Sequence, residues 1–71
     1  MPLIKLMYID DGLAITASAN PVRVEEFKGG YEVGTLGAND ALLAITDEKS
    51  RPVFMVNMDN IISVTIEYEG E

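Results

Sequence analysis

Short apolar segments follow one another along this chain, and turn-forming residues separate them at intervals of about ten residues. In several segments apolar and polar side chains alternate, which is the pattern of a strand with one buried face. We therefore expect an all-β fold of six to seven short strands, arranged as a small antiparallel barrel or a compact sandwich. The expected strands are 3–9, 13–18, 22–28, 31–36, 41–46, 53–57 and 61–68.

The first two segments are predicted to form a hairpin. The apolar run 3–9 ends at Asp10-Asp11-Gly12, and an acidic pair followed by glycine is a turn signal. The next segment, 13–18, alternates with period two. Two alternating runs joined by a tight turn are typical of an antiparallel strand pair.

The segment 22–28 has two interpretations. Val22 and Val24 alternate with charged neighbours, and β-branched residues favour a strand. A short helix over 21–28 is the alternative, because Pro21 suits the first helical position and Gly29 could end the helix.

Glycines after this segment predict local backbone features. Gly29-Gly30 fits the two-residue loop of a hairpin between 22–28 and 31–36, because both central residues of such a turn need a positive φ. Gly34 lies inside the second of these strands, where glycine suggests a bulge or a sharp bend.

The length and the residue inventory limit how the fold can be stabilised. The chain has 71 residues, which we interpret as one domain over 1–71 with a frayed tail at 69–71. A core of this size supplies only roughly 3–5 kcal/mol of net stability, so small domains usually add a disulfide, a metal or a partner. There is no Cys and no His, which excludes disulfides and the ordinary Cys/His zinc sites. Self-association or binding to another protein is the support that remains.

The charge balance narrows the choice of partners. The formal net charge is −7, from 12 acidic and 5 basic residues. Such a chain repels nucleic-acid phosphates and anionic membrane surfaces. No run approaches the ~20 apolar residues of a membrane span, and the N-terminal segment lacks the features of a signal peptide. We expect a cytoplasmic protein with no nucleic-acid partner and no membrane partner.

The residue types present in the chain also argue against catalysis. Nucleophilic catalysis needs an activated nucleophile, and the serines Ser18, Ser50 and Ser63 have no histidine to activate them. No loop has the spaced carboxylates of a dedicated calcium site. The five aromatic residues come without a basic cluster, so we expect them to fill the core rather than to stack on bases. The prediction is a protein that is not an enzyme and that has no catalytic residues, no metal site and no cofactor.

One short string has a possible catalytic counterpart. Tyr8-Ile9-Asp10-Asp11 resembles the Tyr-x-Asp-Asp box of reverse transcriptases, in which adjacent carboxylates help to hold magnesium. The resemblance covers four residues, and the chain lacks the length and the basic groove that a polymerase needs. The string is explained by a strand that ends in an acidic turn.

Apolar residues occupy both faces of segments 3–9, 41–45 and 53–56. An isolated antiparallel barrel should show apolar residues on its inner face and polar residues on its outer face. Strands with two apolar faces need a second covering layer, which a second copy or another protein would supply. Irregular packing or a short helix at 21–28 is the alternative cover. The candidate interface residues are Leu3, Met7, Ile9, Val53 and Met55.

These observations predict a non-catalytic interaction or structural module that self-associates, or binds another protein, through an apolar strand face. The alternative is an acidic inhibitor that mimics nucleic-acid phosphate and binds a basic protein. Mimicry needs carboxylates at regular spacing on one face, whereas the carboxylates here fall mostly at expected turns and at the C-terminus.

Overall fold

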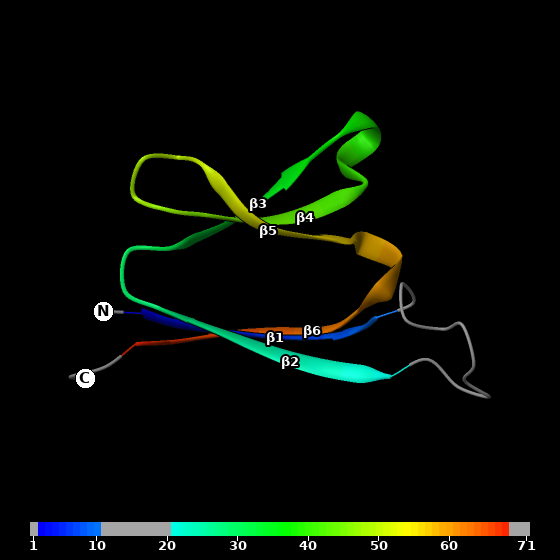
Figure 1. Cartoon of the computed structure of the whole chain (residues 1–71), viewed down its shortest axis with the longest axis horizontal. Helices are drawn as coiled ribbons and strands as arrows, with labels where there is room; N and C mark the ends of the chain where they lie inside the picture. Colours follow the sequence, from blue (N-terminus) through cyan, green and yellow to red (C-terminus); the bar gives the residue numbers. More distant parts are fainter. Residues whose placement is uncertain (1, 11–20, 69–71) are drawn as a thin grey trace.

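The computed structural model describes residues 2–10 and 21–68, which form an all-β structure. Two three-stranded antiparallel sheets lie one above the other (Figure 1). Sheet A has the strand order β2-β1-β6, and sheet B has the order β3-β4-β5. The strands are β1 (Pro2–Ile9), β2 (Val22–Lys28), β3 (Glu32–Leu36), β4 (Leu42–Thr46), β5 (Pro52–Asn57) and β6 (Ile61–Tyr68). Within the described ranges the two sheets stay separate and do not close into a barrel.

The apolar periodicity located these strands to within one residue at most ends. The expected strand 22–28 is confirmed as β2, so the helical alternative over 21–28 is wrong. The expected strand 13–18 lies outside the described residues.

The strand β1 is the central strand of sheet A, since it pairs with β2 along one edge and with β6 along the other.

The hairpin predicted at Gly29-Gly30 is wrong. β2 and β3 belong to different sheets, so the two glycines carry the chain across from sheet A to sheet B. Gly29 has a φ of 107°, whereas Gly30 is not among the described residues with positive φ. Only one of the two positions therefore has the backbone conformation that a two-glycine hairpin turn requires.

Of the bulge or bend predicted at Gly34, the bulge is wrong. β3 pairs with β4 in an unbroken register, in which Gly34 lies opposite Ala44. Register shifts occur elsewhere, between Met7 and Tyr8 in the β1–β6 pair and between Ile45 and Thr46 in the β4–β5 pair. Gly34 is an ordinary extended strand residue beside a small neighbour.

The core lies between the two sheets. Sheet A contributes Ile4, Leu6 and Tyr8 from its central strand β1, and sheet B contributes residues of β4 and β5. The buried members of this cluster are Ile4, Leu6, Tyr8, Leu43, Ile45 and Val56. Because side chains alternate along a strand, this set defines the inner face of each sheet and turns the intervening residues outward.

Aromatic rings fill one side of the same core. The ring of Tyr8 meets Phe54 edge-on at a centroid distance of 5.4 Å, and Phe27 lies 5.7 Å from Phe54 and 5.5 Å from Tyr31. Four of the five aromatic residues thus pack in or against the core, as expected, whereas Tyr68 is exposed.

The hydroxyl of Tyr8 is the polar end of a buried ring. It donates a hydrogen bond of 3.1 Å to Oε2 of Glu25 on β2. Burial raises the pKa of this hydroxyl, and the Glu25 carboxylate raises it further. The hydroxyl therefore stays protonated and keeps its donor role.

No helix in the described ranges has the length and apolar character that a membrane crossing requires.

The two glycines Gly34 and Gly29 should respond to alanine in opposite directions. Gly34 lacks a positive φ, and an added Cβ would meet nothing within 4 Å. Gly34→Ala should raise the free energy of unfolding by about 0.5–1 kcal/mol, because glycine weakens a strand interior. Gly29→Ala should lower it by about 1–2 kcal/mol, because alanine is strained at positive φ. Urea unfolding of both variants at low protein concentration is the measurement, and a shift of the same sign in both would contradict this assignment.

Candidate interaction surfaces

The outer face of sheet B is apolar across all three strands in its middle, between Glu32 and Thr46 at one end and Asn57 at the other. Leu43 and Ile45 point into the core, so the alternate residues Leu42 and Ala44 point outward. Their neighbours in register are also uncharged, with Gly34 and Met55 on either side of Ala44. We call Gly34, Leu36, Leu42, Ala44 and Met55 the sheet B face.

Exposure on the sheet B face is unevenly distributed. Met55 is 53% exposed and Leu36 is 39% exposed, whereas Ala44 between the flanking strands is buried. Val53, beside the bulge in β5, adds a further exposed apolar side chain. Charge enters only at one end, with Glu32 opposite Thr46. The face is therefore a shallow apolar surface with small residues at its centre and larger ones around them.

The outer face of sheet A divides into a charged half and an apolar half. In the charged half Lys5 lies opposite Glu26, and its Nζ is 3.8 Å from Oε2 of Glu67. In the other half Met7 pairs with Val24, and Ile9 pairs with Val22. We call Met7, Ile9, Val22 and Val24 the sheet A patch.

The structure does not bring the five predicted interface residues together. Met7 and Ile9 lie in the sheet A patch, whereas Met55 lies on the sheet B face, with Val53 beside it. These two surfaces are on opposite sides of the molecule, because each faces away from the shared core. Leu3 is separated from Met7 and lies in the charged half of sheet A, opposite Lys28 and Glu67.

Sequence reasoning missed the exposed valines of β2. The alternation of Val22 and Val24 correctly predicts a strand, but both valines point outward and are more than half exposed. Phe27 determines which alternate residues of β2 face inward, because it lies opposite Ile4 and packs against the core. Arg23 and Glu25 therefore share the inward side of β2 with Phe27, and the exposed valines could be found only once that aromatic anchor was known.

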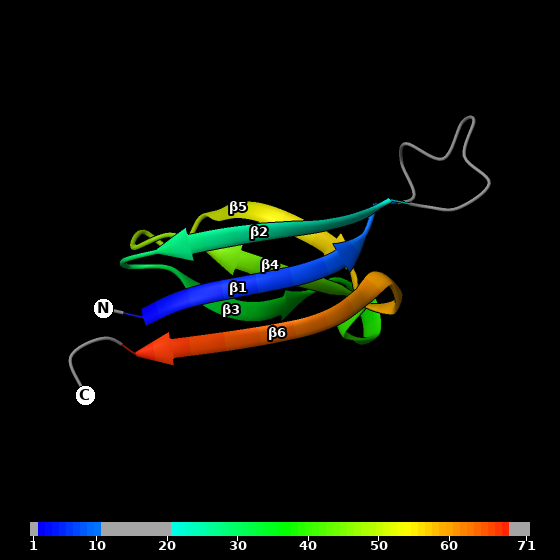
Figure 2. The same cartoon turned by 90° about the horizontal axis from the view of Figure 1, so that it is seen from below.

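A third apolar surface runs along β6, which forms an edge of sheet A. Val64 and Ile66 are opposite the core residues Leu6 and Ile4, so they point to the inner side of the sheet. Sheet B does not cover them, and β6 lies at the open margin of the stack (Figure 2). Four alternating side chains are between 37% and 66% exposed, and we call them the β6 row: Ile62, Val64, Ile66 and Tyr68.

A groove connects the β6 row with sheet B. It has a volume of about 280 Å³ and lies between Ile66 and Tyr68 on one side and Tyr31 and Val33 on the other. Its lining also includes Ile4 of the core. The groove therefore borders the edge of the core.

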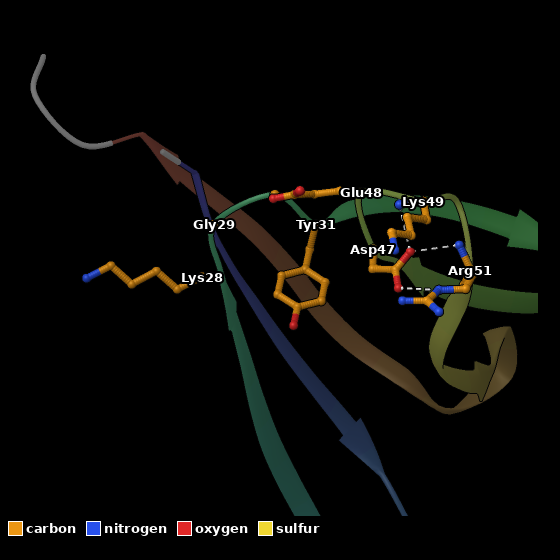
Figure 3. Close-up of a pocket in the computed structure, with 8 residues that line it drawn as sticks. Lys28, Gly29, Tyr31, Asp47, Glu48, Lys49 and Arg51 are labelled. Carbon is orange, nitrogen blue, oxygen red and sulfur yellow. Dashed lines mark hydrogen bonds and ion pairs between the residues drawn. The ribbon is translucent and has the colours of Figure 1, made fainter.

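A polar pocket of about 390 Å³ lies where the β2–β3 connection meets the β4–β5 turn (Figure 3). Residues of the β2–β3 connection line one side, and the turn residues Asp47, Glu48, Lys49 and Arg51 line the other. The carboxylate of Asp47 accepts hydrogen bonds of 2.9 Å from the backbone N–H groups of Lys49 and Arg51 and from Nε of Arg51. Its oxygens are thus used in holding the turn, in which Ser50 has a φ of 62°.

The hydrogen bonds to Asp47 lower the pKa of its carboxyl group, with the backbone N–H of Arg51 the largest cause. Desolvation opposes this effect in part. The pocket is lined by charged side chains and a tyrosine, and the lowered pKa of Asp47 keeps its carboxyl group ionised at neutral pH. That arrangement suits a rigid turn.

The string Tyr8-Ile9-Asp10-Asp11, which resembles the Tyr-x-Asp-Asp box, lies among the described residues as far as Asp10. Oδ2 of Asp10 lies 2.7 Å from Nε of Arg23, and the Asp10 backbone N–H donates to the carbonyl of Pro21. Asp11 lies outside the described residues. Within residues 2–10 and 21–68, no three acidic side chains come together in a group that could hold a metal ion.

No protein-family model matches this chain, and no curated protein or solved structure matches it significantly. The surfaces themselves are therefore the basis for a functional proposal.

Asp47 should make a defined contribution to acid stability. A folded-state pKa below the unfolded value stabilises the fold above the unfolded pKa, and this stabilisation is lost as the pH falls through the folded pKa. Replacing Asp47 with Asn should therefore destabilise the protein at neutral pH, and the difference from wild type should narrow as the pH falls through the folded-state pKa of Asp47, where the wild-type carboxyl group loses its charge. Urea midpoints between about pH 2 and pH 7 measure this, with Asp59→Asn as the control for loss of one turn carboxylate. A constant difference across that range would contradict the proposed role of the Asp47 carboxylate.

Proposed function

We propose that this chain is a non-catalytic interaction or structural module that self-associates, and that the sheet B face is covered by a second copy. In this proposal the two stacked sheets are a compact sandwich whose outer layer is itself an interface. The carrying observation is that the middle of a sheet face, from Leu36 through Ala44 to Met55, has no charged side chain.

Size makes such cover useful to the chain. The described core contains only a few fully buried side chains, and the protein has no cysteine to add a disulfide. Burying an exposed aliphatic side chain contributes about 1.5–3 kcal/mol. Covering the exposed halves of Leu36, Val53 and Met55 on two copies would then contribute roughly 5 kcal/mol before the cost of association. That is the order of the fold's own net stability, so folding and association should be coupled.

Flat apolar faces with small central residues suit this kind of contact. Sheets pack face to face at about 10 Å, and their side chains interdigitate. Gly34 leaves room at the centre of the face for a larger side chain of the second copy, such as Met55, because a Cβ added at Gly34 would meet nothing within 4 Å. A twofold axis through the face would place the same residues on both sides.

The acidic-mimic alternative has weaker support. Among the described carboxylates, Asp10, Asp47 and Glu67 each lie within ion-pair distance of a basic side chain of the same chain. They are at turns and at one end of sheet A rather than in a regular row on one face. A phosphate mimic would keep its carboxylates available to a basic partner.

Met55→Glu should dissociate the contact between sheet B faces, because a carboxylate would be buried without a partner. The matched control is Val24→Glu, since Val24 is 54% exposed and Met55 is 53% exposed, and the two residues lie on opposite sides of the molecule. Sedimentation equilibrium and thermal melts from roughly 1 to 100 µM should show association and a concentration-dependent Tm for wild type and for the control. Met55→Glu should lower the mass and reduce that dependence while keeping the β-sheet circular dichroism. Dissociation by Val24→Glu alone would assign the interface to the sheet A patch instead.

Salt separates the proposed function from the acidic-mimic alternative. Self-association through an apolar face should not weaken between roughly 50 and 300 mM NaCl, because apolar contacts are not screened. Mutual repulsion between copies of net charge −7 is reduced by salt, so a modest strengthening is expected. Sedimentation at several salt concentrations measures the self-association. Salt-sensitive capture by an immobilised basic protein, in place of self-association, would support the mimic.

A further inference from the structure

We infer that β6 is a second association site, at which it pairs antiparallel with β6 of another copy. The two copies would share one continuous sheet with the strand order β2-β1-β6-β6-β1-β2. This contact uses a sheet edge and is independent of the proposed contact through the sheet B face. The occupant of the β6 edge is thus a second copy of this chain.

Among the edge strands in the described sheets, β6 is the least protected against pairing. Native proteins protect exposed edges with charges, prolines, bulges or short strands. β2 has four charged residues among seven, β3 is five residues long with a central glycine, and β5 begins at Pro52 next to a bulge. β6 has eight residues, of which only Glu67 is charged, and it contains neither proline nor glycine. Its own bulge lies near its start, where Ile62 is skipped in the pairing with β1, so residues 63–68 are the regular and unprotected part of this edge. Every residue of β6 after Ile61 is exposed.

The sequence of β6 is complementary to itself in one antiparallel register. A twofold axis at Thr65 places Val64 opposite Ile66 of the second copy and the bulge residue Ile62 opposite Tyr68. The β6 row then pairs with apolar residues, and the polar Ser63 lies opposite Glu67. Centring the axis on Glu67 would oppose two carboxylates, which destabilises a strand pair, and centring it on Val64 would place Glu67 opposite the apolar Ile61. The register at Thr65 has neither of these mismatches.

The same pairing would cover the apolar surface beside the edge. The second copy's β6 would extend sheet A next to the β6 row, with its own row on the same inner side (Figure 2). The side chains of Ile62 and Val64 from that copy would lie next to Tyr68 and Ile66, which border the groove toward β3. A single contact would therefore supply hydrogen-bond partners for the backbone edge of β6 and cover the apolar side chains of the β6 row.

A single-cysteine variant tests the register directly, because the chain has no cysteine of its own. Opposed residues of an antiparallel pair have Cα atoms about 4.5–5.5 Å apart, within disulfide range. Under mild oxidation Thr65→Cys should form a covalent dimer. The matched control is Ser63→Cys on the same outward side of the same strand, which in this register lies four residues from its own counterpart and should cross-link at least about tenfold more slowly. Equal cross-linking of both variants, or of neither, would overturn the proposal.

A charge at the twofold axis provides an equilibrium test. Thr65→Glu lies opposite Lys5 within its own chain, so the fold should tolerate it. In the pair, two glutamates would oppose one another, which should weaken β6 association by at least about tenfold relative to the neutral control Thr65→Gln. Retained mass for Thr65→Glu would contradict the proposal.

Combining this change with Met55→Glu distinguishes the two contacts. Wild type should form species larger than a dimer at high concentration, since two separate twofold contacts link more than two copies. Each single variant should stop at a dimer, and the double variant should be a monomer of 7.8 kDa. If Thr65→Glu alone reduces wild type to a monomer, the sheet B contact fails and the β6 contact stands. If Met55→Glu alone does so, the reverse holds.

Discussion

The apolar contact between the two central strands is the interaction on which the other features depend. Ile4 and Leu6 of β1 share one buried cluster with Leu43 and Ile45 of β4, and each of these side chains is at most 5% exposed. Because side chains alternate with period two, burying this set turns every intervening residue of both strands outward. The outer apolar surfaces of the molecule follow from this parity. Burial of the opposite set in β1 would instead have placed Lys5 in the core.

Two thin sheets of three strands cannot enclose all of the apolar side chains in this sequence. Seven hydrophobic residues of the described ranges are buried, whereas ten large ones are exposed. The buried ones belong to the central strands and to β5, and the exposed ones lie mainly on edge strands and outer faces. In a small domain most residues are close to the surface. The exposed apolar surfaces are therefore a consequence of size, and the proposed association would cover them.

Charge and apolar surface are separated in this molecule. The acidic residues lie mostly at turns and strand ends, where Asp10 and Asp47 meet Arg23 and Arg51. The sheet B face and the β6 row have almost no charge. A strongly negative net charge keeps unassembled copies apart at long range, whereas contact surfaces without charge allow close packing once copies meet. In the proposed function, repulsion between copies and association would therefore depend on different parts of the same small surface.

The sequence by itself determined the strands. Period-two alternation, apolar runs and turn residues located β1 to β6 closely, because these signals are local and depend on neighbouring residues alone. The sequence also determined that several segments are apolar on both faces, which is why Met55 and Met7 were expected at an interface. Tertiary structure decided which strands pair, which face of each is inward and which apolar residues share a surface. Gly29-Gly30 shows the limit of prediction from local sequence, since a tight turn and a crossover between sheets have the same local composition. β2 shows the same limit, because the packing of Phe27 against Phe54 turns Val22 and Val24 to the outer face. Contacts between residues far apart in the chain determine which strands pair and which face of each strand is inward, and a local sequence pattern carries no information about such contacts.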